Sequence, residues 1–227
     1  NSRFANAGSF APLTVLTTPG TLFHAGPVAA HAYYFETRMK LIDMLWHGLA
    51  QAMPGRLPAG HFASIFGTVI AGTHPDTQRR YAMVEPQMGG WGATADRAGQ
   101  NAMFSTNHGD TFNCPVEIAE ARYGFDVVEK SLAFGPQLPG EHPGGAGVHI
   151  TYRLRNKATL SVGYSHAVEP VWSVDGASEG GKNHLRIRRG DGTQEDHCFA
   201  SDVALNAGDL VEVRTAYGGA MHATSNT

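Results

Sequence analysis

The chain has 227 residues, enough for one large domain or two small ones with a substantial buried core. Its formal net charge is −3, and 16% of its residues are charged, against roughly 25% in an average soluble domain. Basic residues cluster only at 186–190 (RIRRG), which argues against the coherent basic face of a nucleic-acid-binding protein. The low charge fraction predicts surface that is buried against a partner and poor solubility of the isolated chain; a compact, Gly-rich monomer is the alternative.

The two cysteines, Cys114 and Cys198, stand far apart and lack CxxC spacing. This argues against a zinc site and a disulfide framework and suits a reducing cytoplasm. No apolar run reaches the length of about 18 residues that spans a bilayer, and no signal-peptide pattern opens the chain. The first residue is Asn1, which is compatible with a processed or partial chain.

The first half predicts one short strand at 13–17, a turn at Pro19-Gly20 and one long amphipathic helix. The helix is predicted from apolar residues spaced alternately three and four apart, which suits a helix laid on a domain core better than a coiled coil. Glu36 precedes Lys40 by four residues, so we expect an ion pair on the outer face. Pro54-Gly55 ends the pattern. The apolar residues are Ala32, Phe35, Met39, Ile42, Trp46, Leu49 and Met53.

The following residues predict strands at 61–72 and 79–88, a Gly-rich loop at 89–100 and a short helix at 115–123. From Gly124 onward the pattern is β. Residues 148–155 alternate apolar and polar, and a similar run at 160–164 follows the turn RNKA, which predicts a hairpin. Further strands are expected around 185–187 and 211–213. The fold class is therefore α+β, a β-rich body with mainly antiparallel strands in the second half, in a single region 1–227 with a soft division near 105–125.

Three glycine motifs, GGWGATADRAG, GGAGVH and YGGA, lack the spacing of a dinucleotide-binding turn or a P-loop. No ATP cradle is therefore expected in this chain. The purely structural interpretation of these glycines is that they allow turns with positive φ.

The segment 106–124 (TNHGDTFNCPVEIAEARYG) is the densest group of polar residues. Its second part is explained as a helix: Pro115 suits the first position, Asn113 or Cys114 the cap, Glu117 the first turn, and Gly124 the end. A reactive Cys114 thiolate at the helix start, and acid–base work by Glu117 with Glu120, are possible alternatives to packing and capping.

The first part, NHGDTFN, has no such structural explanation. It can be a polar loop, a metal-binding pair of His108 and Asp110, or a substrate contact. Asn107, His108 and Asp110 are therefore the candidate catalytic residues, with Trp91, Asn113 and Glu117 as candidate substrate or loop contacts.

Six stretches occur in the order expected of the hydantoinase B/oxoprolinase family, which the chain resembles over nearly its whole length. They are residues 6–30, GGWGATADRAGQ, NCPVEIAEARYG, GGAG before a Tyr-Arg strand, PVWSVDGASEGG and GDLVEVRTAYGG. The region 89–124 is the most specific of them.

The resemblance implies a subunit of an ATP-dependent hydrolase that opens a cyclic amide, such as a hydantoin, 5-oxoproline or a lactam, through a phosphorylated intermediate. ATP would bind a hydantoinase A-like partner, and a divalent metal ion (Mg, Mn or Zn) would stabilise developing charge. A related branch consists of ketone carboxylases for acetone or acetophenone. A silent structural subunit of such a complex is the alternative from another class.

The resemblance further implies that this chain corresponds to the C-terminal portion of a longer hydantoinase B-like subunit, whose absent N-terminal portion would carry the metal ligands. No metal or cofactor site is therefore assigned to this chain. Pro143 stands where the family usually has an Arg before its Gly-Gly, and Met221 and His222 replace further glycines near the end. The lost Arg removes a bidentate anion contact, which favours a divergent substrate.

Overall fold

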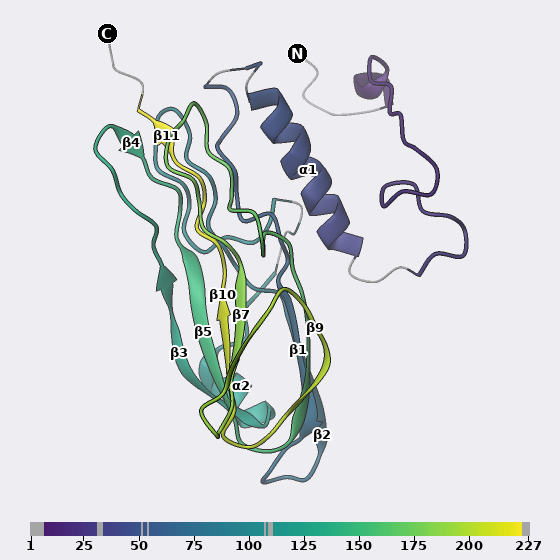
Figure 1. Cartoon of the computed structure of the whole chain (residues 1–227), viewed down its shortest axis with the longest axis vertical. Helices are drawn as coiled ribbons and strands as arrows, with labels where there is room; N and C mark the ends of the chain where they lie inside the picture. The colour runs from purple at the N-terminus through teal and green to yellow at the C-terminus, as the bar shows by residue number, and fades with distance from the viewer. Residues whose placement is uncertain are drawn as a thin grey trace.

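The computed structural model describes residues 7–30, 34–50, 52–53, 55–106, 108 and 111–223. Two antiparallel sheets face each other at one end of an elongated body (Figure 1). The first has the order β2 (Arg80–Glu85), β1 (Gly67–Thr73), β6 (Ala158–Gly163), β9 (Ala200–Leu205). The second has the order β3 (Phe125–Ala133), β5 (Gly147–Leu154), β10 (Leu210–Arg214), β7 (His184–Arg188), β8 (Gln194–His197).

The remaining elements are few: the 3₁₀-helix η1 (Ala7–Phe10), the helices α1 (Tyr34–Ala50) and α2 (Val116–Arg122), and the short pair β4 (Glu141–His142) and β11 (Met221–His222). The molecule is thus a β-rich α+β fold with mainly antiparallel strands, as the sequence predicts. In the described part of the chain, no helix is both long and apolar enough to cross a bilayer.

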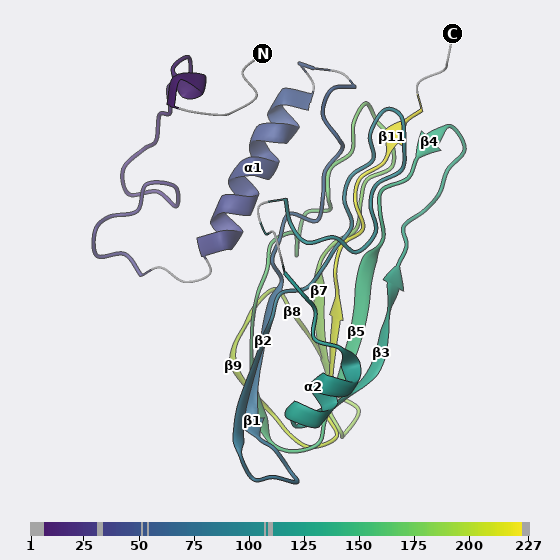
Figure 2. The ribbon, with the colours of Figure 1, turned by 180° about the vertical axis from the view of Figure 1, so that it is seen from behind.

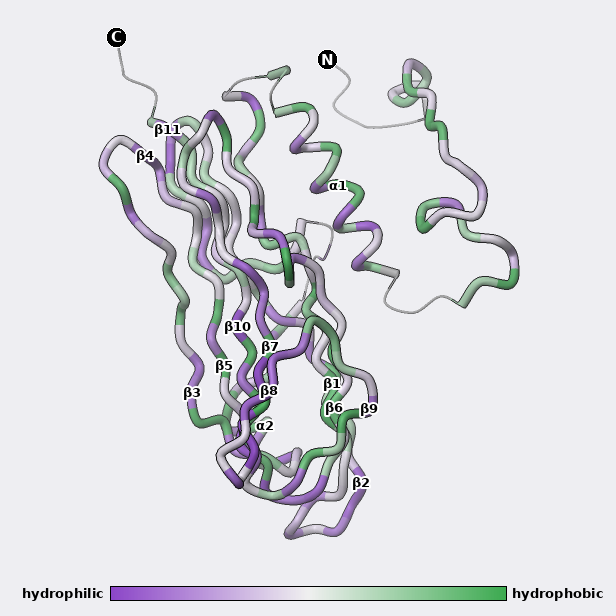
Figure 3. The backbone as a smooth tube through the Cα atoms, in the orientation of Figure 1, coloured by the Kyte–Doolittle hydropathy of each residue, from purple (hydrophilic) through white to green (hydrophobic). Residues whose placement is uncertain are grey.

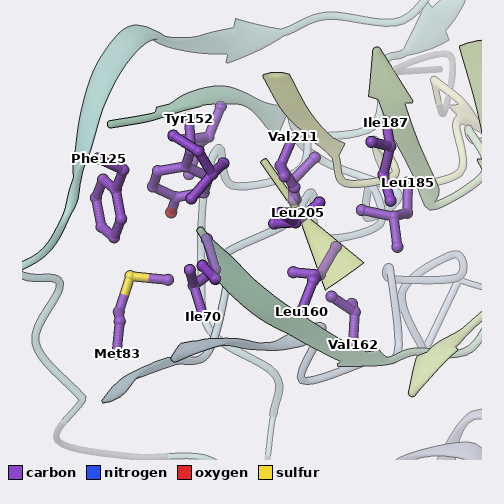
Figure 4. Close-up of a cluster of buried hydrophobic side chains, with 14 of the residues drawn as sticks. Ile70, Met83, Phe125, Tyr152, Leu160, Val162, Leu185, Ile187, Leu205 and Val211 are labelled. Carbon is purple, nitrogen blue, oxygen red and sulfur yellow. The ribbon is translucent and has the colours of Figure 1, made fainter. Parts of the chain in front are cut away.

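The main hydrophobic core fills the space between the two sheets (Figure 4). Ile70, Met83, Leu160, Val162 and Leu205 project from the first sheet toward Phe125, Tyr152, Leu185, Ile187 and Val211 of the second. In β5 the alternating residues Val148, Ile150, Tyr152 and Leu154 are all buried, which confirms the predicted apolar face.

The predicted hairpin between residues 148–155 and 160–164 is wrong, because its two strands belong to different sheets. β5 pairs with β3 and β10, whereas β6 pairs with β1 and β9. The turn carries the chain across the core: the backbone N–H of Arg155 donates to Gly124, and the Asn156 amide donates to the carbonyl of Thr73. Alternation in sequence identifies a strand but not its neighbour.

Beyond the sheets lies a second region built from extended segments that are neither helix nor regular sheet, seen as parallel tubes near β4 and β11 in Figures 1 and 2. We call this region the glycine-rich half. We call the two facing sheets the sheet half. The glycine-rich half comprises residues 59–66, 86–104, 143–146, 165–183 and 215–220. The predicted strand at 61–72 is split by this boundary, since only its second part forms β1.

Hydrogen bonds between distant backbones hold the glycine-rich half together. The N–H of Ala59 donates to Ala93, that of Ala93 to Gly219, and that of Gly219 to Gly60, at 2.8–3.0 Å. The motif glycines make these contacts possible by close approach, not by turn geometry. A Cβ on Gly92 would lie 1.9 Å from the carbonyl oxygen of Ala59, and one on Gly145 would lie 1.9 Å from that of Gln100.

The interpretation of the three glycine motifs as turns with positive φ is therefore wrong. Among the described residues, glycines with positive φ occur elsewhere, for example at Gly20, Gly192 and Gly208, all in turns.

Helix α1 packs along the glycine-rich half (Figure 1). Ala32 and Pro54, at the ends of the predicted pattern, lie outside the described residues. Met39 is buried as expected and Phe35, Ile42 and Trp46 are half-buried, but Leu49 is exposed. The predicted outer ion pair of Glu36 and Lys40 is also wrong, because both side chains turn inward to partners far away in sequence.

Residues 7–30 form an arm on the far side of α1 from the sheets (Figure 2). The strand predicted at 13–17 is absent there, because those residues have no neighbouring strand. The predicted turn at Pro19-Gly20 is present, with Gly20 at φ +80°.

The short helix α2 is confirmed, but not its predicted caps. Pro115 occupies the cap position, without a side-chain cap hydrogen bond, so neither Asn113 nor Cys114 caps the helix. The first turn contains Glu117, as predicted. Gly124 follows an extended Tyr123, and a Cβ there would lie 2.9 Å from the Tyr81 ring, so packing explains this glycine.

Candidate functional site

A buried charged cluster lies where α1 meets the glycine-rich half. Its centre is Asp43, only 1% exposed, on the same helix face as Met39. One carboxylate oxygen of Asp43, Oδ1, accepts a 2.6 Å hydrogen bond from the Trp172 indole. The other, Oδ2, lies 2.8 Å from Lys40 Nζ and 3.2 Å from His166 Nε2. A carboxylate at this depth is tolerated because it is paired and hydrogen-bonded.

The tautomer of His166 follows from its contacts. Its Nδ1 lies 3.1 Å from the carbonyl oxygen of Glu169, which can only accept, so Nδ1 carries a proton. In neutral His166 the bare Nε2 then accepts from Lys40 Nζ at 3.1 Å; in the protonated form Nε2 donates to Asp43.

Electrostatics favour the charged form of Asp43. Burial alone would raise the pKa of Asp43, but hydrogen bonds from His166, Lys40 and Trp172, together with the Lys40 charge, hold this pKa well below its usual range. The cluster therefore carries a stable buried anion.

The backbone of His166 is strained, with φ +55°. Such a conformation costs a non-glycine residue about 1–3 kcal/mol and is found preferentially at functional sites. Asn183 fixes this turn: its N–H donates to the carbonyl of His166 and its Nδ2 to that of Ser165.

One helical turn before Lys40, Glu36 ties α1 to two distant segments. Its Oε1 accepts from the Ser64 hydroxyl at 2.9 Å and from the Ile65 N–H at 2.5 Å. Its Oε2 accepts from the Ser165 hydroxyl at 2.7 Å. The inner face of α1 is thus held by directed polar contacts as well as by packing.

Next to this cluster, His61 lies between two indoles. Its ring centroid is 5.6 Å from that of Trp46 and 6.5 Å from that of Trp91. His61 is 1% exposed, and neither ring nitrogen has a hydrogen-bond partner in the part of the chain that the structure describes. Burial lowers the pKa of His61 to about 4, so the ring is neutral at neutral pH.

The row of aromatic rings continues from Trp91 to His108, in the segment NHGDTFN. The Trp91 indole donates to the carbonyl of Phe104 at 2.8 Å, and the Phe104 ring lies 5.6 Å from that of His108. The His108 ring also lies 5.9 Å from Phe35 in the first turn of α1. The structure therefore places Trp91 and His108 in one neighbourhood, between α1 and the glycine-rich half.

The other predicted site residues are distributed differently. Asn107 and Asp110 lie outside the described residues. Asn113 is half-buried, and within the described ranges its side-chain amide has no hydrogen-bond partner. Glu117 is exposed on α2, beside the sheet half (Figure 2).

The sequence interpretation missed Lys40, Asp43, His61 and His166. The one available signal was Asp43, a charge four residues after Met39 and thus on the apolar face of the predicted helix. His61 and His166 carry no local pattern, because only the fold brings them to α1.

A cavity of about 320 Å³ opens beside this cluster, at the low end of the range for small-molecule sites. His47 and Trp172, whose rings stack at 4.6 Å, line it together with Ser173 and the turn Asp175-Gly176. The motif PVWSVDGASEGG thus forms one wall of the cavity. Through Trp172 it also supplies a hydrogen-bond donor to Asp43.

The described residues do not form a divalent metal site. Within these ranges, no group of three or more His, Cys, Asp or Glu side chains could hold a metal ion. The Lys40 ammonium already balances the Asp43 carboxylate and would repel a second cation.

Comparison with known proteins adds relatives for nearly the whole chain. An uncharacterized protein of Methanocaldococcus jannaschii is 26% identical over 216 residues, which are 94% of this chain and 37% of that protein. The crystal structure of an ATP-dependent caprolactamase from Pseudomonas jessenii matches 96% of this chain and 39% of its own, with a TM-score of 0.76 and 20% identity. A nucleotide-free acetone carboxylase matches 79% of this chain and 29% of its own, with a TM-score of 0.60 and 14% identity.

The two structural matches show a common fold, and this chain spans less than half the length of each relative. The family model for Hydantoinase B/oxoprolinase matches residues 2–221. The chain therefore belongs to the hydantoinase B/oxoprolinase family.

Proposed function

We propose that this chain is part of an ATP-dependent enzyme complex that opens a cyclic amide, such as a hydantoin, 5-oxoproline or a lactam, through a phosphorylated intermediate. The observation that carries the proposal is the family match over residues 2–221. The fold shared with an ATP-dependent caprolactamase over 96% of the chain supports this substrate class.

The chemistry divides between the chains of such a complex. An amide carbonyl is a poor electrophile, and phosphorylation of its oxygen supplies a good leaving group. A hydantoinase A-like subunit would bind the ATP, and a divalent metal ion would be held outside the described part of this chain. The remainder of the B-type polypeptide is the second partner.

Within this chain, His108 with Asn107 and Asp110 is proposed to face the substrate, with Trp91 and Asn113 as contacts. His108 lies against Phe104 and Phe35, and Asn113 offers both an amide donor and an acceptor, the pair of groups that a cyclic amide itself presents. Lys40, Asp43 and His166 hold α1 and Trp172 together in the same part of the molecule.

The test is ATP turnover by the purified complex. A hydantoin or a lactam should stimulate turnover, whereas a ketone with bicarbonate should not. If neither a hydantoin nor a lactam changes the rate, the cyclic-amide proposal is wrong.

A ketone carboxylase is the second candidate, favoured by the fold shared with acetone carboxylase over 79% of the chain. In that case a ketone should stimulate ATP turnover only when bicarbonate is present. The bicarbonate requirement separates the two reactions, because amide opening consumes water and no carbon dioxide source.

A structural subunit without substrate contacts is the remaining alternative. If His108 acts in proton transfer, His108→Ala should lower turnover by about 100-fold or more while the complex still assembles. Arg122→Ala is the matched control, because Arg122 is exposed on α2 and is not a candidate contact. Unchanged turnover in an assembled His108→Ala complex would favour the structural role.

A further inference from the structure

The arm, residues 7–30, and the outer face of α1 present a large apolar surface. From residue 8 onward every arm residue is exposed. Val28, Leu16 and Val15 are 96%, 88% and 83% exposed, respectively. Figure 3 shows hydrophobic residues recurring along the arm and on α1. The large apolar side chains exposed on these two elements are Phe10, Leu13, Val15, Leu16, Leu22, Phe23, Val28, Leu41, Met44, Leu45 and Leu49.

The arm and α1 form a shared groove of about 550 Å³. Its walls come from the arm, including Leu22 and Phe23, and from α1, including Thr37, Arg38 and Leu41. Arm residues also bond to one another: the Thr17 hydroxyl lies 2.9 Å from His24 Nδ1, and the Gly20 N–H donates to the His24 carbonyl. These bonds shape the arm without burying its apolar side chains.

Exposing this much apolar area to water is unfavourable in free energy. A single exposed apolar residue is ordinary, but a continuous patch from two elements marks an interaction site. Burial of apolar area is favourable by about 25 cal/mol per Å², so covering this many side chains is a strong driving force for association.

The lengths of the relatives favour one kind of occupant for this surface. The caprolactamase match includes 96% of this chain, so only about nine residues fall outside it, whereas the arm spans 24. Most of the arm thus belongs to the shared fold. In that relative, 61% of the chain has no counterpart here, since the matched part is 39%.

We propose that the arm and the outer face of α1 form the docking surface for the remainder of a hydantoinase B-type polypeptide, on the same chain or a separate one. In these relatives more than half of the chain lies outside the matched portion, which favours that additional sequence as the occupant over a second copy of the present portion. The proposal rests on family membership and not on the reaction.

Site-specific photo-crosslinking in the assembly purified from its own cells tests the proposal. A benzoylphenylalanine replaces Leu16 on the arm or Leu45 on α1, with Phe199 as the control. Phe199 is 71% exposed and lies between β8 and β9, in the sheet half. Crosslinked peptides are then identified by mass spectrometry.

The expected result is that Leu16 and Leu45 both crosslink to hydantoinase B-type sequence outside these 227 residues, while Phe199 does not. Crosslinks from Leu16 and Leu45 to a second copy of this portion or to the ATP-binding chain, or no crosslink from either position, would overturn the proposal. The readout does not depend on ATP turnover, so failure of the proposed reaction leaves it intact.

A binding measurement sharpens the result. Leu45→Glu should weaken association with the rest of the B-type polypeptide about tenfold or more, because it places a charge in an apolar interface. Where the two portions share a chain, they are joined by a cleavable linker for this measurement. Phe199→Glu is the matched control and should leave the affinity unchanged; equal affinity of the two variants contradicts the proposal.

Discussion

The sheet half and the glycine-rich half of this molecule are held together in different ways. In the sheet half, apolar side chains from two sheets fill the space between them. In the glycine-rich half, backbones touch directly, and a buried anion, Asp43, ties α1 to the segments beneath it. The packing of the sheet half depends on the volume of its side chains. The packing of the glycine-rich half depends on glycines, which have no side chain, and on a buried charge.

This difference has a functional consequence. Apolar packing tolerates volume-conserving substitutions, so a sandwich places few demands on each residue. Close backbone contacts and a satisfied polar cluster fix positions more strictly. The glycine-rich half is therefore suited to hold Trp91, Trp172 and His108 in fixed places.

The largest expected effect comes from the buried anion. Asp43→Ala should lower the free energy of unfolding by about 3–5 kcal/mol, because Lys40 and Trp172 lose their buried partner. Denaturant unfolding followed by Trp fluorescence measures this, since Trp46, Trp91 and Trp172 all lie in or against the glycine-rich half. Asp175→Ala is the control, as Asp175 is exposed; an equal loss in both variants would contradict the role of Asp43.

The glycine contacts come next. Gly92→Ala should destabilise by about 3 kcal/mol or more, because the new Cβ would lie 1.9 Å from a backbone oxygen that cannot move aside cheaply. Gly190→Ala, in the sheet half, is the matched control: nothing lies within 4 Å of its Cβ position, so a change within about 0.5 kcal/mol is expected. Thermal unfolding of both variants makes the comparison, and similar midpoints would refute the close-approach interpretation.

The pH dependence of stability should also reside in the glycine-rich half. The folded pKa of His61 is lowered from 6.5 to about 4, so the unfolded chain binds a proton first as pH falls. The contribution of neutral His61 to the free energy of unfolding is therefore fully present above pH 6.5. It is lost as pH falls from 6.5 to 4, by up to about 3 kcal/mol. His61→Phe should flatten the unfolding free energy over that window.

Asp43 acts in a different window. Because its folded pKa is depressed, its contribution is present above the unfolded value of about 3.9 and is lost only as pH falls below that value. Unfolding curves of wild type and His61→Phe at pH 7, 5 and 4 separate the two groups. The same slope in both proteins would show that His61 is not responsible.

The smallest effect is expected at a surface ion pair of the sheet half. Arg155 Nη2 lies 2.7 Å from Asp76 Oδ2, but the two side chains are 31% and 63% exposed. Arg155→Ala should therefore cost less than about 1 kcal/mol. A loss as large as that of Asp43→Ala would remove the contrast between buried and exposed charges on which the comparison rests.

The sequence by itself determined the β-rich α+β class, the apolar face of β5, the short helix α2 and the membership of a family. These follow from local periodicity and from motifs that stand in order along the chain. Its choice of Trp91 and His108 as site residues stays a prediction, although the structure brings both residues next to Phe104.

Only the tertiary structure decided the rest. That β5 and β6 separate into two sheets depends on pairing with β3, β10, β1 and β9, which alternation cannot specify. The inward turn of Glu36 and Lys40 depends on Ser64, Ser165 and His166, which lie 28, 129 and 126 residues away from their helix partners. Local pattern records which side of a helix is polar, but the partners that make a polar side face inward exist only after the chain has folded.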